Sequence, residues 1–229
     1  MKLFPHVMRP AVFVLFCAAT VSACGNEADM DPGARLLKLL AQTATARVTG
    51  GKSAPDATPS DLDLRAALQE GGKPIIKLRN DNTGATAYLA PVAVNQGITT
   101  WSSNDRLTLS SRDGVLLATR GFGADLMAAN VPTAARIARG GGTHDRLHVY
   151  LDGGDQTQKF TFTCTVATVG PEAITVMGLS YNTRHVTETC SGKSGTATNH
   201  YWFQGAQIRQ STQFLAPGVP GVTLQAVID

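Results

Sequence analysis

The sequence predicts an all-β domain, in which an antiparallel, strongly curved sheet of about ten or more strands forms a half-barrel or a sandwich. From residue 75 onward, short apolar stretches are separated by turn residues, and apolar and polar side chains alternate with a period of two. No long helical pattern separates these stretches. Strands that follow one another without intervening helices pair with their neighbours, which favours an antiparallel sheet.

The first 23 residues have the features of a signal peptide. Lys2 and Arg9 supply positive charge, and the apolar run at 11–19 is too short to span a bilayer. This segment ends in Val21-Ser22-Ala23, and Cys24 follows it, so that small residues precede a cysteine, as lipoprotein processing requires. We therefore expect lipid attachment at Cys24 and cleavage before it. Plain secretion is the alternative, because its cleavage also follows small residues.

An acylated Cys24 would hold the protein stably on a membrane, because it carries more than one chain. Gly25 follows the cysteine, in place of the Asp that is associated with retention in the inner membrane. The expected location is the periplasmic face of the outer membrane. No other apolar stretch is long enough for a transmembrane helix. The chain thus divides into a signal peptide at 1–23, a lipidated tether at 24–59 and a single β-rich domain at 60–229.

One or two short helices are expected before the sheet. The first begins near Pro32 and places Leu36, Leu37 and Leu40 on one face. That face packs on the sheet or, alternatively, lies on the membrane surface, although its polar side is not rich in Lys or Arg.

A second helix is expected over 62–68, after a break rich in Gly and Pro. Ser60 or Asp61 would cap this helix, and Gly71 and Gly72 would end it. Arg112-Asp113-Gly114 is typical of a hairpin turn between apolar runs. Strands are expected at 75–78, 87–94, 107–109, 147–151, 160–166, 174–177, around 185–187, and at 201–203, 208–214 and 222–227.

The charge of the chain excludes one broad class of partner. Without residues 1–23, which contain Lys2 and Arg9, 18 basic residues remain beside 17 acidic residues. Nucleic-acid binding requires a basic patch, and the nearly neutral mature chain has few clusters of Lys or Arg. No nucleic-acid partner is expected.

The four cysteines have separate expected fates. Cys17 would be lost with the signal peptide, Cys24 would carry lipid, and Cys164 and Cys190 would remain. Two remaining cysteines in an oxidising periplasm most simply form a disulfide. A zinc site that includes His185 is the alternative, but neither cysteine belongs to a CxxC pair.

No catalytic residue, metal site or cofactor is predicted. His144 and His148 lie on an expected strand, where positions i and i+4 are roughly 13 Å apart, so they cannot share one ion. Ser194 lacks the G-x-S-x-G spacing, and the Gly-Lys-Ser motifs at 51–53 and 192–194 lack the first glycine of a P-loop. Paired carboxylates for glycoside hydrolysis remain an alternative, but most candidates stand beside Gly or Asn, as turn aspartates do: Asp105, Asp113, Asp125, Asp145, Asp152 and Asp155.

Three aromatic residues are candidate contacts for a glycan or a protein partner. Trp101, Tyr201 and Trp202 have flat apolar rings that suit stacking on sugar rings. Packing against the sheet is the alternative role for all three rings.

A structural motif is expected at 119–126. Gly121 and Gly123 permit sharp backbone geometry, and Arg120 and Asp125 are placed to pair across a turn. This segment is expected to have a conformational role rather than to contact a ligand.

Several motifs in order resemble the YjbF/GfcB family of outer-membrane lipoproteins: GITTW at 97–101, DGVLLATRGFGADLM at 113–127, NHYWF at 199–203 and IRQSTQ at 208–213. The resemblance extends from about residue 60 to the end and includes the signal-peptide cysteine. It implies a lipid-anchored, non-enzymatic accessory protein of exopolysaccharide or group 4 capsule production or export. The implied partners are an outer-membrane β-barrel protein and periplasmic proteins of the same system, with the polysaccharide as a candidate ligand. An envelope carrier or chaperone that holds acyl chains in an apolar trough and, less favoured, a polysaccharide-modifying enzyme are the alternatives.

Overall fold

The computed structural model describes residues 59–122, 125–151, 156–216 and 221–229. The predicted signal peptide, Cys24, the first predicted helix and Gly123 therefore lie outside the described residues, as do Asp152 and Asp155.

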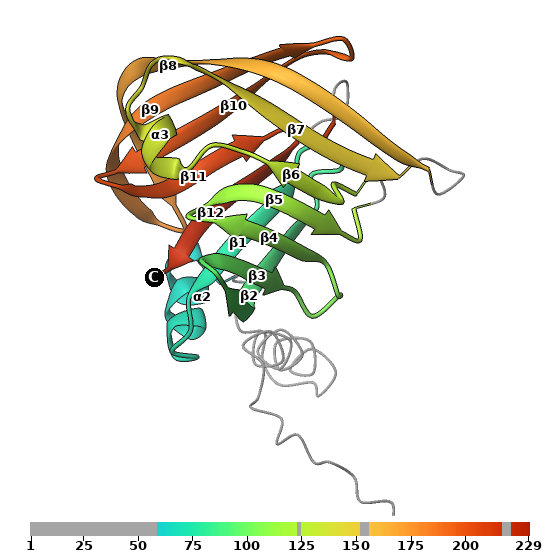
Figure 1. Cartoon of the computed structure of the whole chain (residues 1–229). Coiled ribbons are helices and arrows are strands. Elements are labelled where there is room, and N and C mark those ends of the chain that lie inside the picture. The colour runs from blue at the N-terminus through green and yellow to red at the C-terminus, as the bar shows by residue number, and fades with distance from the viewer. Residues whose placement is uncertain (1–58, 123–124, 152–155, 217–220) are drawn as a thin grey trace, which may run out of the picture.

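In the described part of the chain, twelve antiparallel strands form one sheet that curves into a nearly closed barrel (Figure 1). Each strand pairs with its neighbours in sequence except β5 and β6, which are the two edges of the sheet, and β1 also pairs with β12. The all-β prediction is confirmed, with a barrel in place of the sandwich alternative. The strands are β1 (Ile75–Asn80), β2 (Thr86–Asn95), β3 (Ile98–Ser102), β4 (Thr108–Arg112), β5 (Val115–Arg120), β6 (Ala128–Asn130), β7 (Thr143–Leu151), β8 (Thr157–Val176), β9 (Leu179–Gly192), β10 (Gly195–Gln204), β11 (Gln207–Gln213) and β12 (Val222–Ile228).

The strands follow the predicted alternation, although some are longer than expected. Phe162, Cys164 and Val166 of β8 point inward, whereas the threonines between them are exposed. The predicted strands at 160–166 and 174–177 are both part of β8. A bulge at Gly170, whose φ is 146°, lets this strand bend and continue.

Turn and cap residues explain the local boundaries. Asp113 and Gly114 have φ angles of 51° and 84°, and they form the predicted hairpin turn between β4 and β5. The predicted second helix is α2 (Asp61–Gln69). The Ser60 hydroxyl accepts from the Asp63 amide at 3.2 Å, and the Asp63 carboxylate accepts from the Ser60 amide at 3.0 Å. These reciprocal bonds form a capping box.

A short helix that was not predicted, α3 (Ala134–Ala138), precedes β7 and is capped by Thr133. Its five residues are too few to establish a helical period in the sequence. A cavity inside the barrel is lined by α3 together with Trp101 of β3 and Ile208 of β11. The helix therefore lies over one end of the barrel lumen.

The barrel has two rims. The first, which we call the helix rim, carries α3 and the β2–β3, β4–β5, β8–β9 and β10–β11 turns (Figure 1). The chain also enters and leaves the barrel at this rim, through α2 before β1 and Asp229 after β12. The remaining strand connections lie at the opposite rim, which we call the loop rim.

The core lies on both sides of the sheet. Inside the barrel, Leu78, Leu89 and Leu109 are at most 1% exposed, and each such burial contributes roughly 1.5–3 kcal/mol. On the outer wall, α2 packs Leu68 against Ile75, Val227 and the tip of the β8–β9 hairpin. Arg65 of α2 donates to the carbonyls of Val176, Met177 and Val227, and so joins the helix to both elements. Neither described helix has the length and apolar character needed to cross a membrane.

Candidate functional site

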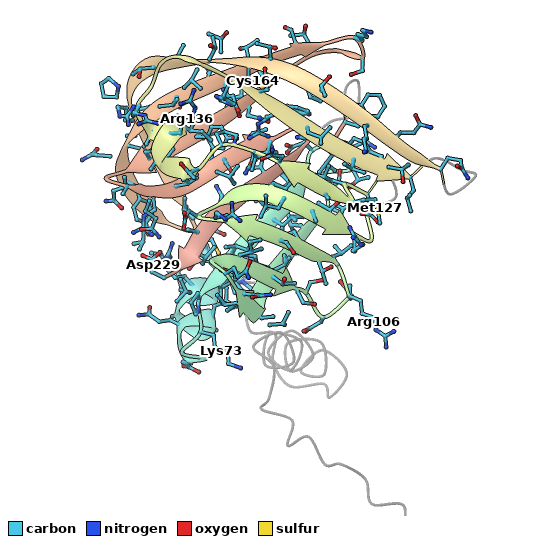
Figure 2. The ribbon with its side chains drawn as sticks, in the orientation of Figure 1. Lys73, Arg106, Met127, Arg136, Cys164 and Asp229 are labelled. Atoms are coloured by element: carbon cyan, nitrogen blue, oxygen red, sulfur yellow. A yellow bond between two sulfur atoms is a disulfide. The ribbon has the colours of Figure 1, made fainter. Side chains whose placement is uncertain are left out.

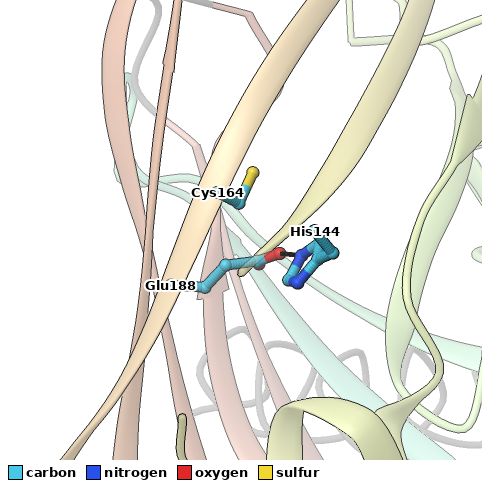
Figure 3. Close-up of side chains that lie close together, drawn as sticks. All are labelled: His144, Cys164 and Glu188. Atoms are coloured by element: carbon cyan, nitrogen blue, oxygen red, sulfur yellow. Dashed lines mark hydrogen bonds and ion pairs between the residues drawn. The ribbon is translucent and has the colours of Figure 1, made fainter. Parts of the chain in front are cut away.

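A buried polar cluster inside the barrel is centred on Glu188 of β9. Its carboxylate accepts from Arg146 Nε at 2.8 Å, Asn199 Nδ2 at 2.8 Å and the Tyr201 hydroxyl at 3.0 Å. His144 Nε2 lies 2.6 Å from the same carboxylate (Figure 3). Alternation along β7, β9 and β10 brings these inward side chains together.

The neighbours of Glu188 keep its carboxylate ionised. Burial opposes ionisation of Glu188, but the bond from His144, the positive charge of Arg146 and the bond from Asn199 outweigh it and lower its pKa to about 2. Burial also raises the pKa of Tyr201 well above its usual range. Glu188 is 0% exposed and Arg146 is 2% exposed, so the ion pair is closed to solvent. This carboxylate is engaged in structure and cannot reach a substrate.

One group of potential metal ligands occurs among the described residues: His144, Cys164 and Glu188, whose ligand atoms lie within 4.8 Å of one another (Figure 3). The Cys164 sulfur is bonded to Cys190, which confirms the predicted disulfide. A disulfide sulfur lacks the thiolate character that a metal ligand requires. The group does not form a metal site while this bond is intact.

The zinc alternative at Cys190 and His185 is wrong. His185 Nδ1 lies 2.9 Å from the Glu172 carboxylate, and His185 Nε2 lies 3.0 Å from His200 Nδ1. This histidine therefore belongs to a separate cluster, in which its ring stacks on Trp202.

His148 of β7 is buried in the lumen of the barrel. Its ring stacks on Phe214 at a centroid distance of 4.9 Å and meets the edge of Phe162 at 5.5 Å. Burial, together with the positive charge of Arg146, lowers the pKa of His148 to about 4. His144 and His148 thus share β7 but have different partners.

A cavity of about 640 Å³ opens into the barrel at the helix rim. Most of its lining is apolar. Trp101 and Ser111 lie on the sheet, and Ala134, Ala135 and Ala138 form the α3 wall. The other lining residues are Pro74, Ile76, Asp113, Gly114, Ala206, Gln207, Ile208, Ser211, Leu224, Gln225, Ala226, Ile228 and Asp229.

The three predicted contact aromatics occupy different environments. Trp101 borders the cavity, and its Nε1 donates to Ser111 Oγ at 3.1 Å. Tyr201 is 0% exposed and binds Glu188, so its burial contradicts a contact with a glycan in solution. Trp202 packs in the cluster of α2 and the β8–β9 tip, where its ring stacks on His185 at 4.5 Å. Only Trp101 of the three lines the cavity.

The predicted motif at 119–126 lies where β5 approaches β6. The Asp125 carboxylate accepts from the amides of Gly121 at 2.9 Å and Phe122 at 3.1 Å. Arg120 instead donates to the carbonyl of Leu126 at 3.1 Å. The expected Arg120–Asp125 pair is absent from the contacts of these described residues, because backbone amides already engage the carboxylate.

This motif closes the seam of the barrel. The amide of Thr119 donates to the carbonyl of Leu126 at 2.8 Å, and the amide of Leu126 donates back to the Thr119 hydroxyl at 3.0 Å. Gly121 has a φ of 90°, a conformation that other residues rarely adopt. These contacts support the predicted conformational role.

The candidate aspartates do not show a shared site. Asp113 is at the β4–β5 turn and Asp125 is in the seam motif, whereas Asp145 of β7 accepts from the Thr163 hydroxyl at 3.0 Å. Sequence reasoning did not identify Glu188, Arg146 or the α3 alanines. Inward alternation on β7 and β9 was the available signal for the buried ion pair.

The comparisons with known proteins agree with this fold. The structure of the hypothetical lipoprotein YmcC from Escherichia coli is similar with a TM-score of 0.65 and 20% sequence identity. The similarity covers 82% of this chain and 94% of that chain, and at this identity it supports the fold alone. No curated protein matches the sequence. A family model described as "Group 4 capsule polysaccharide lipoprotein gfcB, YjbF" matches residues 59–227. Because this match includes well over half of the sequence, the chain belongs to the YjbF/GfcB family of group 4 capsule polysaccharide lipoproteins.

Proposed function

We propose that this lipoprotein is an accessory protein, anchored on the periplasmic face of the outer membrane, that acts in the production or export of an exopolysaccharide or capsule. The observation that carries this proposal is the match of a capsule lipoprotein family across residues 59–227. The Val21-Ser22-Ala23-Cys24 sequence supports the anchor, because it provides the cysteine that lipoprotein processing acylates.

The protein acts by binding rather than by catalysis. The family is a capsule lipoprotein family rather than an enzyme family. Within the described residues, Glu188 is the buried carboxylate with a strongly lowered pKa, and four neighbouring side chains already engage it. Such a group stabilises the barrel and has no free face for a reacting molecule.

Two exposed apolar side chains on β2 support binding of a protein partner. Val92 and Val94 are 64% and 70% exposed near the end of β2, where a β-bulge between Pro91 and Ala93 interrupts its pairing with β3. Apolar side chains grouped on a surface mark contact sites for other proteins. We therefore assign this surface to a periplasmic or outer-membrane partner of the same export system.

A second candidate function is favoured by the cavity at the helix rim. Its volume of about 640 Å³ lies within the range of small-molecule sites, and its lining is predominantly apolar. A carrier or chaperone that holds a lipid chain would have such a cavity.

A gene deletion tests the main proposal. The deletion is expected to lower secreted polysaccharide, and the wild-type gene is expected to restore it. Complementation with Cys24→Ser is expected to fail, because the product lacks its anchor. The matched control is Cys17→Ser, which changes a cysteine within the predicted signal peptide and leaves the acylation site intact. Unchanged polymer in the deletion strain overturns the role in export, and full rescue by Cys24→Ser overturns the need for the anchor.

A further inference from the structure

The cavity at the helix rim is shaped by small and apolar side chains. Ile76, Ile208 and Leu224 form its floor on the sheet, and Ala134 and Ala138 face it from α3. Alanine side chains fill little space, so this helix lies over the lumen without closing it. The cavity is therefore a consequence of the α3 sequence as well as of the barrel.

The charges around the cavity are acidic. Its lining contains Asp113 and Asp229 but no Lys or Arg. The Asp229 carboxylate accepts from Arg209 Nη1 and from Gln207 Nε2, both at 2.7 Å. Asp113, which is exposed at the β4–β5 turn, has no ion-pair partner within the described ranges. A ligand with a phosphate or carboxylate head would meet the Asp113 carboxylate at the mouth, and the nearby cation, Arg209, is already paired with Asp229.

The mouth lies at the rim where the barrel begins and ends. Pro74, between α2 and β1, and Asp229, after β12, both line it, and Figure 2 labels Asp229 beside the region of α2. Pro59 precedes α2, and 35 positions of the sequence separate it from the predicted lipid site at Cys24. A chain of that length spans at most about 120 Å. Membrane attachment at Cys24 therefore keeps the mouth within reach of membrane lipids.

From these three observations we propose that the cavity binds a single alkyl chain of a lipid whose head group carries no negative charge. The cavity volume of about 640 Å³ equals that of about twenty water molecules at ~30 Å³ each. A methylene group is comparable in size to a water molecule, so a chain of about a dozen carbons enters with space left at the mouth. This inference rests on the carrier function named as the second candidate above. It is tested in vitro, so its failure is distinguishable from failure of the polymer assay.

The first test measures affinity against chain length. The full chain carrying Cys24→Ser is purified without detergent, and 1-alkanols of increasing length displace the uncharged fluorescent probe N-phenyl-1-naphthylamine. The dissociation constant is expected to fall about fourfold for each added methylene, until the chain fills the cavity at about twenty carbons. Absence of binding, or a steady gain in affinity without a plateau, overturns the proposal, because a flat surface imposes no length limit.

The second test concerns charge. Dodecanoate at neutral pH is expected to bind at least about tenfold more weakly than dodecanol, because its carboxylate faces Asp113. Asp113→Asn retains a residue that tolerates the positive φ of this turn and removes the charge. In this variant, the affinity for dodecanoate is expected to be closer to the affinity for dodecanol than it is in the wild type. Equal binding of dodecanoate and dodecanol to the protein carrying Asp113 overturns the assignment of an uncharged head.

The third test blocks the cavity. Ala138→Phe fills the α3 wall, and Ala206→Trp places a ring over the mouth at an exposed turn position, where folding is tolerant. Each is expected to weaken dodecanol binding at least about tenfold. The matched control is Ala173→Trp at an exposed position of β8 outside the lining. Circular dichroism confirms that each variant folds. Unchanged binding in Ala206→Trp, or an equal loss in Ala173→Trp, overturns the site.

Discussion

Glu188 and Arg146 show how a polar pair is held inside an apolar barrel. Burying two charges costs free energy that their attraction recovers only when further hydrogen bonds satisfy both groups. Glu188 receives additional bonds from Asn199 and Tyr201, and Arg146 also donates to the Tyr201 hydroxyl at 3.0 Å. The pair is therefore tied to three strands, β7, β9 and β10, and it specifies their register.

Glu188→Gln is expected to lower the free energy of unfolding by about 3–5 kcal/mol, because it leaves the Arg146 charge buried without a counter-charge. Urea denaturation followed by circular dichroism measures the loss. Glu172→Gln is the matched control, since the Glu172 side chain is 46% exposed and pairs with His185 near solvent. Its expected effect is below about 1 kcal/mol. Similar losses in the two variants would contradict the structural role of Glu188.

His148 predicts a loss of stability in mild acid. Its pKa is about 4 in the folded barrel, against an ordinary value of 6.5. The unfolded chain takes up this proton below 6.5 and the folded chain only near 4, so acid favours unfolding. The contribution is intact above pH 6.5 and falls by about 3 kcal/mol as the pH approaches 4. Glu188, whose pKa falls from 4.5 to about 2, extends the loss to lower pH.

The His148→Phe variant tests this assignment. It keeps an aromatic ring between Phe162 and Phe214 and removes the titrating group. The difference in urea midpoint between pH 7 and pH 4.5 is expected to be smaller in the variant than in the wild type. An equal difference in both proteins would assign the acid sensitivity to other groups.

The disulfide joins the two strands of the β8–β9 hairpin. Cys164 and Cys190 are direct partners in the register of the two strands, with their Cα atoms 3.9 Å apart. The bond therefore fixes the same alternation that points Val166 and Glu188 into the barrel. A slip by one residue would move both side chains to the outer face.

The Cys164→Ala/Cys190→Ala double variant is expected to lose about 3–4 kcal/mol of unfolding free energy, because the bond closes a loop between positions 26 residues apart. Thermal or urea unfolding measures this loss. Dithiothreitol should destabilise the wild type by a similar amount and leave the double variant unchanged. A reductant effect of equal size on both proteins would contradict the assignment.

Local patterns predicted the elements that local chemistry determines. The Ser60 cap, the Asp113-Gly114 turn and the alternation of β8 each depend on residues within a few positions of one another. The burial of Tyr201 and the cavity below α3 were not predictable in this way, because they depend on strands distant in the sequence. The Arg120–Asp125 prediction failed because opposite charges are visible in a sequence, whereas competing backbone amides are not.

At the scale of the whole molecule, the strand order runs from β5 through the β1–β12 pair to β6 and forms a nearly closed ring. The β1–β12 pairing joins the two ends of the barrel chain, and the seam between β5 and β6 completes the circuit. The stability of each part of the sheet therefore depends on the strands on both sides of it. Such a sheet has no independent half, which predicts cooperative unfolding.

The two tryptophans test this cooperativity, because Trp101 lies on β3 and Trp202 lies on β10. Trp101→Phe and Trp202→Phe each leave one fluorescent reporter. In each variant, the urea midpoint from fluorescence is expected to coincide with the midpoint from far-ultraviolet circular dichroism. Separate midpoints within one variant would show that parts of the barrel unfold independently.

The even number of antiparallel strands has a further consequence. With twelve strands in the ring, the first strand starts and the last strand ends at the same rim, which is also the rim where the cavity opens. Gain or loss of a whole hairpin would change the circumference but preserve this parity. A barrel of this kind can therefore change in size while the first strand still begins, and the last strand still ends, at the rim where the cavity opens. A change by one strand would place the beginning of the first strand and the end of the last strand at opposite rims.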